Sequence, residues 1–345
     1  MKKWKKWLSL GLACTLVLTL FAGCSKSVPE TIGTVNGKEI STNELLYYIN
    51  SAVANVEQNM NQTYDQFKDV EVEGQTFTEY VKDTALDEAI KNRLIEQKFD
   101  ELGLTFDEAG QTEVDEMITS LESQYGGSDK LDEALKKIGT DRETFKQIGV
   151  VSYKQMKIQE KLYGEGGDEE VTDQDVTDYY NDEYTQVKHI LISTRDQDGN
   201  TLEDSMKQIK QQLANDLLAQ IKAGADFDEL MKSNTEDVDQ EGNPNSPDGY
   251  IFDSDGNYIE PFKEKSLTME IGSVEMVETD YGYHIIKRLD HKTNETFLAE
   301  NFDTIKNKII SNKITAMLDV MLKNADKQID DEAVKNIKIT GSSKS

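Results

Sequence analysis

Two histidines that could act together occupy short apolar segments about 95 residues apart in the chain. His189 lies within residues 187–193 and His284 within residues 281–287. Both segments are rich in β-branched and aromatic residues and are bounded by turn-forming residues, which is typical of short β-strands. Side chains alternate along a strand, so His189 shares a face with Val187 and Leu191. Because a buried imidazole needs a hydrogen-bond partner, we predict that the strands are neighbours and that the two rings bond to each other.

The segments around these strands are expected to form an α+β unit that positions the histidines. In chain order, the predicted elements are a polar loop at 195–205, a long amphipathic helix, a loop with two prolines at 234–249, a strand at 250–252, a helix opened by Pro261, and strands at 272–278 and 282–289. The helix carries Met206, Ile209, Leu213, Leu217 and Ile221 at helical spacing. The third histidine, His291, follows the last strand and is expected at the surface.

The first part of the chain, residues 31–170, is predicted to be helical. Ser41 and Glu44 form a capping pair at one helix start, and Gly103 ends another helix. The tail is predicted to contain a long apolar helix at 294–329 and a last strand at 337–340. Because that helix needs a surface to dock on, we expect the tail, residues 292–345, to pack back on the N-terminal helices. Residues 171–291 would then be a domain inserted into a helical domain built from both chain ends.

The N-terminal sequence predicts that the protein is exported from the cytoplasm. Residues 1–23 combine four lysines with an apolar run, which is typical of a secretory signal. Small residues precede Cys24 as in the lipobox of bacterial lipoproteins, and residues 24–30 would form a tether. The alternative is a transmembrane anchor, although the apolar run is short for a span of about 20 residues. Two acyl chains on a lipidated Cys24 would suffice for stable anchoring.

Charge and cysteine content exclude several classes of protein. The chain has 38 basic and 66 acidic residues, and four lysines belong to the signal, which leaves a net charge near −32. Nucleic acid and anionic lipid both demand a basic surface, so neither is an expected partner. The acidic surface could steer basic unfolded chains, or be a solvated surface without a specific partner. Cys14 lies in the signal, so Cys24 is alone and no disulfide can form within one processed chain.

The order of these segments resembles a known domain. A strand with His189, a long helix, the Gly-Ala-Asp-Phe turn at 224–227, an aspartate-bearing loop and the final Tyr-Gly-Tyr-His-Ile-Ile at 281–286 resemble the parvulin peptidyl-prolyl isomerases. The flanking segments, with Val-Asn-Gly at 35–37 and the returning C-terminal helix, resemble PrsA-type foldase lipoproteins and SurA. The resemblance implies a four-stranded sheet with surrounding helices, inserted into a mainly helical SurA- or PrsA-like domain.

The resemblance also assigns site residues. It implies that His189 and His284 pair beneath the site and join Asp237, Thr279 and Tyr283 in a network, with Glu236 or Asp239 as alternatives to Asp237. Phe262 would form the aromatic floor of a proline pocket, with Tyr258 beside it and Ile251 or Tyr250 as an apolar wall. The basic cluster of phosphate-specific parvulins is missing, since only Lys188 and Arg195 lie near the mouth of the site, so no phosphoserine requirement is expected.

The implied reaction is rotation about an X-Pro bond, whose barrier is about 18–20 kcal/mol. Nothing covalent need form, and neither a metal nor a cofactor is expected. The implied function is a membrane-anchored, extracytoplasmic peptidyl-prolyl isomerase and chaperone at a Gram-positive cell surface. Its partners would be unfolded or partly folded exported polypeptides with X-Pro bonds and the membrane, through lipid on Cys24, with homodimer formation left open. One alternative is a holdase whose parvulin domain is weak or inactive. The other is a solute-binding lipoprotein, which would need two α/β lobes.

Overall fold

The computed structural model describes residues 29–339. The predicted signal, Cys24 and most of the 24–30 tether lie outside the described residues, as does Thr340 of the predicted last strand. Contacts divide the chain into two compact units, residues 1–170 with 310–345 and residues 171–309. The first unit therefore draws on both ends of the chain, and the second contains both site histidines.

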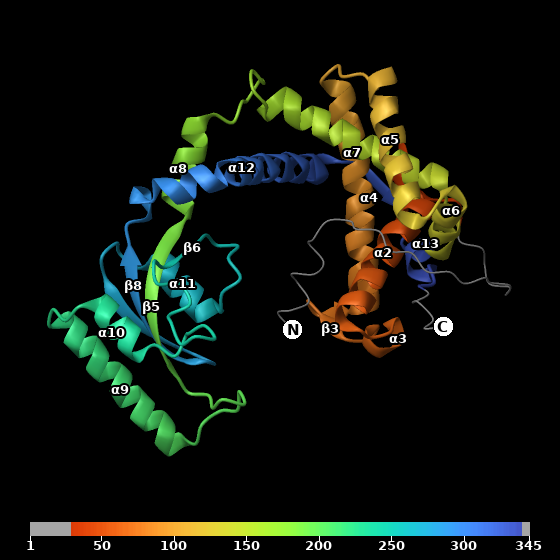
Figure 1. The fold of residues 1–345 in the computed structure, drawn as a ribbon. Coiled ribbons are helices and arrows are strands. Elements are labelled where there is room, and N and C mark those ends of the chain that lie inside the picture. Colours follow the sequence, from red (N-terminus) through yellow and green to blue (C-terminus); the bar gives the residue numbers. More distant parts are fainter. Residues whose placement is uncertain (1–28, 340–345) are drawn as a thin grey trace. The chain divides into compact units, whose positions relative to one another are not determined.

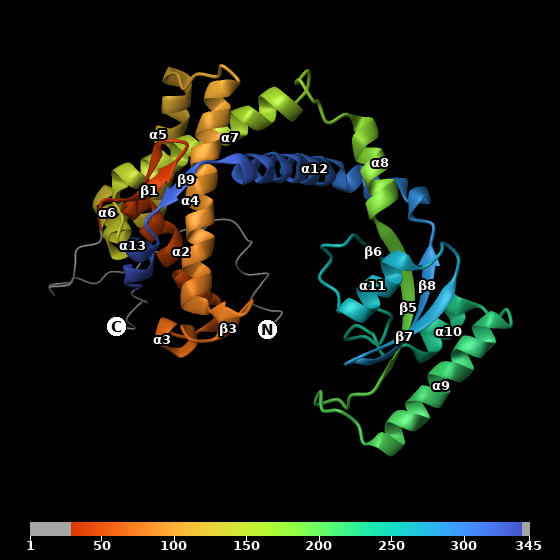
Figure 2. The same cartoon turned by 180° about the vertical axis from the view of Figure 1, so that it is seen from behind.

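The first unit is mainly helical (Figure 1), with a small sheet that joins both chain ends (Figure 2). Its elements are β1 (Thr31–Val35), β2 (Lys38–Ser41), α2 (Thr42–Met60), α3 (Tyr64–Phe67), β3 (Glu71–Val72), β4 (Gln75–Thr76), α4 (Phe77–Glu101), α5 (Glu108–Tyr125), α6 (Ser128–Lys137), α7 (Arg142–Tyr163), β9 (Lys327–Ile329) and α13 (Asp331–Asn336). The sheet order is β2-β1-β9, with Gly33 opposite Ile329. Gly33 has φ +154°, and a Cβ there would meet the Gln328 carbonyl oxygen at 2.4 Å, so glycine permits this pairing.

Local signals set most helix ends of this unit. The Ser41 hydroxyl accepts the Glu44 N–H (3.1 Å) at the start of α2. The Glu44 carboxylate bonds to Asn92 and Arg93 instead of returning to Ser41, so the predicted pair is only half a capping box. The predicted strand at 337–340 is wrong, because the last strand is β9 and α13 follows it. The tail helix, α12 (Glu295–Asn324), accordingly ends five residues earlier than predicted.

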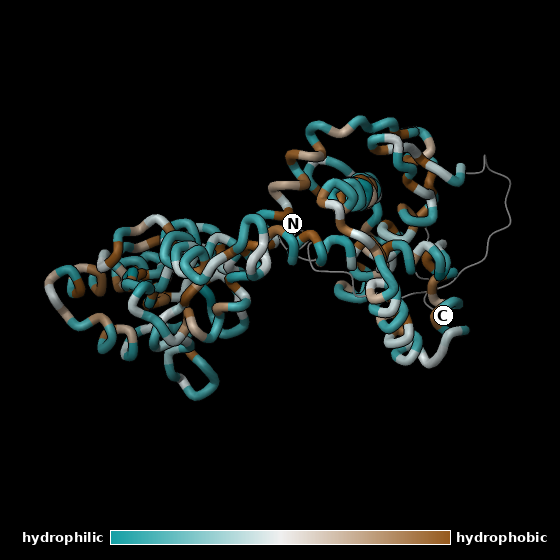
Figure 3. Tube along the Cα trace, turned by 90° about the horizontal axis from the view of Figure 1, so that it is seen from above, coloured by the Kyte–Doolittle hydropathy of each residue, from teal (hydrophilic) through white to brown (hydrophobic). Residues whose placement is uncertain are grey.

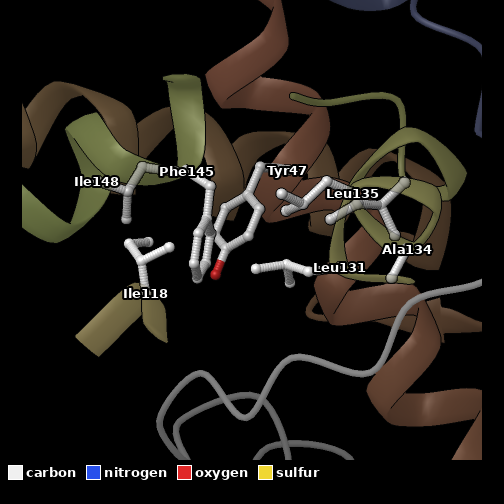
Figure 4. Packing of buried hydrophobic residues seen from close by; sticks show 8 residues of the cluster. Tyr47, Ile118, Leu131, Ala134, Leu135, Phe145 and Ile148 are labelled. Atoms are coloured by element: carbon white, nitrogen blue, oxygen red, sulfur yellow. The ribbon is translucent and has the colours of Figure 1, made fainter. Parts of the chain in front are cut away.

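The core of the first unit is built where α2, α5, α6 and α7 meet. Figure 4 shows Tyr47 of α2 lying against Phe145 of α7, with ring centroids 5.8 Å apart. The buried members of this cluster are Tyr47, Ile118, Leu131, Ala134, Leu135, Ile138, Phe145 and Ile148. Full burial of one large apolar side chain contributes about 1.5–3 kcal/mol. This packing, more than helix propensity, holds the four helices together.

The second unit is an antiparallel sheet with helices on both faces (Figures 1 and 2). Its elements are α8 (Asp173–Glu183), β5 (Thr185–Ser193), α9 (Asp204–Lys222), α10 (Phe227–Asn234), β6 (Tyr250–Phe252), α11 (Glu260–Thr268), β7 (Val274–Thr279), β8 (Gly282–Leu289), the 3₁₀ turn η1 (His291–Thr293) and the first half of α12. The strand order is β6-β5-β8-β7. One face packs Ile190 and Ile285 against α9 and α10. The other face packs Val187 and Ile286 against Phe262 of α11.

The second unit extends to residue 309, past the predicted boundary at 291, because the start of α12 packs on it. Phe297 stacks on Tyr180 of α8, with ring centroids 5.8 Å apart. Lys308 pairs with Asp253 and lies 2.7 Å from the Asp255 carboxylate. His291 is 1% exposed, so the expected surface position is wrong. Its Nε2 lies 3.2 Å from the backbone carbonyl oxygens of Tyr180 and Asn181.

Hydrophilic residues predominate along the trace, with hydrophobic residues interspersed (Figure 3). This pattern agrees with amphipathic helices that bury one face. Within residues 29–339, no helix combines the length and the apolar character that a membrane crossing requires.

Candidate active site

The register of β5 and β8 brings the two histidines together. The strands are antiparallel neighbours, with His189 opposite Ile286 and Leu191 opposite His284. Both imidazoles therefore project from the same face of the sheet as diagonal neighbours. Their Nδ1 atoms lie 3.0 Å apart, and the ring planes differ by 9°. Both side chains are buried, so the bond between them satisfies atoms that would otherwise lose water at a cost.

Two side chains bind the outer nitrogens of this pair. Nε2 of His189 lies 2.8 Å from Oδ2 of Asp237, and Nε2 of His284 lies 2.9 Å from the Thr279 hydroxyl. The segment with Asp237 follows α10 and bonds to β5 beyond the residues that pair with β6. There the Leu191 N–H donates to the Thr235 hydroxyl (3.2 Å), and the Glu236 N–H donates to the Leu191 carbonyl (2.8 Å).

With both rings neutral and Asp237 ionised, donors and acceptors match in one direction along this chain of bonds. His189 donates from Nε2 to Asp237, so its Nδ1 must accept the Nδ1–H of His284. Nε2 of His284 then accepts the Thr279 hydroxyl, whose oxygen accepts the Tyr281 N–H (3.1 Å). Burial, with a smaller contribution from His189, lowers the pKa of His284 to about 3, so this ring is neutral at physiological pH.

Asp237, and neither Glu236 nor Asp239, is the carboxylate that bonds to the histidine pair. The hydrogen bond from His189, with further ones from Tyr250 and Asn245, holds the pKa of Asp237 far below its usual range although burial opposes this. The Glu236 carboxylate instead accepts the Ser193 N–H and pairs with Lys210. The Asp239 carboxylate accepts backbone N–H groups of its own loop, those of Glu241 and Asn243, at 2.9 Å each.

Aromatic rings surround the histidine pair on the same face of the sheet. The Phe262 ring centroid lies 5.1 Å from that of His189 and 5.2 Å from that of His284. Tyr258 packs on Phe252 (4.2 Å), and Tyr250 meets His189 edge-on (5.5 Å). Phe262 is only 3% exposed, so it shapes the site from beneath. The half-buried Tyr250 and Tyr258 offer the aromatic surface that a ligand could reach.

Two of the expected site residues lie elsewhere. Along β6, Tyr250 and Phe252 face the aromatic cluster, so alternation places Ile251 on the opposite face. Tyr250 is thus the residue on the site side. Tyr283 lies in the core beneath α9 and α10 with Ile190 and Ile285, and it does not join the histidine network. The structure also shows two contacts that were not expected. Asn245 and the hydroxyl of Tyr250 bond to Asp237, although no sequence signal singled them out as its partners.

The basic residues nearest the site along the chain are engaged elsewhere. Lys188 Nζ lies 3.0 Å from the Asp228 carboxylate. Arg195 donates from Nε to the Asp280 carbonyl (2.7 Å) and from one terminal nitrogen to the Gly199 carbonyl (2.9 Å). Its guanidinium also lies over the Tyr281 ring. Both side chains therefore have partners away from the histidine network.

A separate hollow of about 670 Å³ lies at the other end of β5. It is lined by Gln186, Asp248, Leu289, Asp290, Thr293, Asn294, Glu295 and Thr296. Gln186 is three residues from His189, so its side chain projects from the opposite face of the strand. The hollow is therefore distinct from the histidine site.

Comparisons with known proteins agree with both units. A family model for the PPIC-type PPIase domain matches residues 175–292, and one for the SurA-like N-terminal domain matches residues 1–147. The chain therefore contains a parvulin-type peptidyl-prolyl cis-trans isomerase domain together with a SurA-like domain.

Similar proteins make the family more specific. The chain is 26% identical to the foldase protein PrsA of Clostridium kluyveri over 335 residues, which cover 89% of this chain and 92% of that protein. It is 28% identical to foldase protein PrsA 3 of Bacillus anthracis, over 66% of this chain and 80% of that protein. A crystal structure of the peptidylprolyl isomerase PrsA from Bacillus anthracis is 24% identical, covering 74% of this chain and 99% of that one, with a TM-score of 0.35. Along most of its length the chain is therefore similar to PrsA foldases, and it combines a PPIC-type isomerase domain with a SurA-like domain.

Proposed function

We propose that the protein acts outside the cytoplasm, anchored to a membrane by lipid on Cys24, and accelerates X-Pro isomerisation in exported polypeptides. Residues 31–170 and the C-terminal segment would hold unfolded clients, while residues 171–291 would carry the isomerase. His189, His284, Asp237 and Thr279 would form the floor of the site. Tyr258 and Tyr250, with Phe262 beneath, would hold the proline ring.

The bonding pattern of Asp237 favours a mechanism without covalent chemistry. Its carboxylate already accepts hydrogen bonds from His189, Tyr250 and Asn245, which makes it a weak base and a poor nucleophile. The histidines are bonded to each other, and His284 resists protonation. Such a floor is rigid and uncharged at its rings, and it suits an amide that loses conjugation as it twists. The rate gain would come from binding the twisted amide more tightly than either planar isomer.

The observation that carries this proposal is the continuous set of hydrogen bonds from Thr279 through both imidazoles to Asp237, in contact with aromatic rings. The set joins residues from three strands and a loop, over 95 positions of sequence. A core histidine needs only one partner to be satisfied, whereas each nitrogen of both rings is bonded here. That degree of order supports a preorganised site.

The decisive experiment is an isomerisation assay on soluble protein that lacks residues 1–24, with a proline-containing peptide as substrate. Acceleration that falls in Asp237→Ala and is retained in Glu236→Gln is expected. Equal rates for wild type and Asp237→Ala would remove Asp237 from the site. Acyl-chain labelling of the full chain, compared with Cys24→Ala, tests the lipid anchor, and sedimentation equilibrium tests for a homodimer.

The second candidate is a holdase in which the parvulin domain is structural. It is favoured by large apolar side chains exposed on the first unit, namely Met60, Val70, Met117 and Met156. Flexible methionine side chains adapt to varied partners. The full soluble chain with Asp237→Ala would then still suppress aggregation of an unfolded client. Loss of protection in that variant, with its fold intact, would count against the holdase.

A further inference from the structure

The two oxygens of Asp237 have three side-chain donors in all. Oδ2 accepts from Nε2 of His189 (2.8 Å) and from the Tyr250 hydroxyl (2.6 Å), and Oδ1 accepts from Nδ2 of Asn245 (2.5 Å). The bond from His189 links the carboxylate to the histidine pair. The other two bonds come from Tyr250 and Asn245, which follow Asp237 in the chain. These two residues are therefore additional to the network of His189, His284, Asp237 and Thr279.

The segment from Asp237 to Tyr250 is a closed loop whose two ends meet at one carboxylate. Residues 238–249 leave Asp237 and return to Tyr250, the first residue of β6, which lies opposite Val187 of β5. Asn245 donates its backbone N–H to the Asp237 carbonyl (3.2 Å) as well as its side-chain amide to the carboxylate. Gly249, with φ +99°, lets the chain enter β6, because a Cβ there would lie 2.9 Å from the Val187 carbonyl oxygen.

We propose that Tyr250 and Asn245 are positioning residues that keep the histidine pair neutral by sharing the negative charge of Asp237. A carboxylate that accepts only from His189 would concentrate its charge on that imidazole and favour the imidazolium. Two further donors spread the charge and lower the proton affinity of the Asp237–His189 pair as a whole. The inference rests on the proposed function of the histidine network, and it assigns Tyr250 and Asn245 a role that the sequence did not indicate.

Among the groups around His189, it is Tyr250 and Asn245 that share the charge of Asp237, because the others are neutral, apolar or paired elsewhere. His284 of β8 resists protonation, and Phe262 of α11 is apolar. The charged side chains of α11 beside it, Lys263 and Lys265, pair with Glu260 and Glu275. Tyr258 packs against Tyr250 and Phe262, but its hydroxyl makes no hydrogen bond to Asp237 in the part of the chain that the structure describes. Burial and the bond to Asp237 raise the pKa of Tyr250 to about 12, so its hydroxyl keeps its proton.

The test is a ¹⁵N NMR titration of the histidine rings in the soluble chain, comparing wild type with Tyr250→Phe and Asn245→Ala. Tyr250→Phe removes one oxygen and retains the ring in its core. We expect the His189 imidazole in either variant to take up its proton about one pH unit higher than in wild type, since one hydrogen bond to a charged group is lost. The acid limb of the pH profile of kcat/KM should move in the same direction.

Two controls separate this effect from general loosening. Tyr258→Phe removes a neighbouring hydroxyl that does not bind Asp237, and it should leave the His189 titration unchanged. His291, buried beside α8, serves as an internal reference whose titration should not move in any of these variants. An unchanged His189 titration in both Tyr250→Phe and Asn245→Ala overturns the positioning role, even if isomerase activity is intact. Absence of activity in wild type would instead overturn the proposed function and leave this titration result standing.

Discussion

The Thr279 hydroxyl lies 2.9 Å from Nε2 of His284, five residues later, across the turn between β7 and β8. Val277 lies opposite His284, and Thr279 lies opposite Gly282, so the threonine reaches along the same face of the sheet as the imidazole. The turn thus places the last donor of the network within one hairpin. The contact depends on little beyond the register of that hairpin, and it offers a direct way to disturb one end of the network.

Thr279→Val should lower kcat/KM for a proline peptide by about 5- to 10-fold. The change removes the hydroxyl from Nε2 of His284 but keeps the branched shape, and one neutral hydrogen bond is worth about 1 kcal/mol. Thr279→Ser keeps the hydroxyl and serves as the matched control, with activity within about 2-fold of wild type. A protease-coupled isomerisation assay measures both. Equal activity of the valine and wild-type proteins would remove Thr279 from the functional network.

Asp237→Asn should reduce kcat/KM by roughly 10- to 100-fold, because a charge-assisted bond to His189 is worth about 1.5–3 kcal/mol. The new amide nitrogen replaces one acceptor oxygen, so it would face either the Asn245 donor or the donors of His189 and Tyr250. Glu236→Gln is the control, since Glu236 bonds to Ser193 and Lys210 instead. If the two substitutions gave similar losses, a local effect on the loop would explain them better than a role of Asp237.

Stability should fall as the pH is lowered from about 6.5 towards 3, and His284 should contribute to this slope. Its pKa is lowered to about 3 in the folded protein, so in this interval the unfolded chain binds a proton that the folded chain rejects. The loss is on the order of a few kcal/mol for this group. Urea unfolding at pH 7 and pH 5 measures it, and His284→Gln should show a smaller pH dependence than wild type. His291, whose pKa burial also lowers, contributes equally to both proteins, so their difference isolates His284.

Phosphoserine-proline peptides should be poorer substrates than alanine-proline peptides. Residues 233–262, which carry Asp237, Tyr250 and Phe262, contain eight acidic residues and no lysine, arginine or histidine. Arg195 and Lys188 are committed to other contacts. Repulsion between exposed charges is screened by salt, so the difference should narrow as ionic strength rises. A preference for the phosphorylated peptide at low salt would contradict the expectation.

Lys308→Met should destabilise the unit of residues 171–309 by about 2 kcal/mol. The lysine reaches from α12 to Asp253, whose side chain is 8% exposed and would lose its cation. The carboxylates of Asp253 and Asp255 raise the pKa of Lys308 against the effect of burial. Asp255 is 76% exposed, so Asp255→Asn should cost less than about 1 kcal/mol. Urea unfolding followed by fluorescence compares the two variants, and equal costs would refute a structural role for the Lys308–Asp253 pair.

Sequence reasoning was most successful where the signals were local. The strand with His189 and the strand with His284 were both predicted, and alternation placed His189 on the face of Val187 and Leu191. The helix start at Ser41 followed its capping side chain. The overall α+β class and the parvulin and SurA-like domains followed from the order of such segments, and the family models confirm them.

The failures have separate physical causes. Tyr283 directly precedes His284 in β8, so strand alternation places it on the opposite face, and its expected place in the network came from the resemblance. The strand β6 has three residues, too few for a period to assign Ile251. The strand β9 reads Lys-Gln-Ile and exists because β1 offers an edge, which is a contact between distant parts of the chain.

The β1–β9 pairing has a consequence for how the polypeptide matures. A chain that crosses a membrane from its N-terminus presents β1 first, yet the partner strand arrives almost 300 residues later. The sheet that closes the first unit must therefore wait for nearly the whole polypeptide to emerge, while residues 171–309 are contiguous and can fold as soon as they appear. With the proposed export, the last folding step of this chain would be delayed until translocation is almost complete.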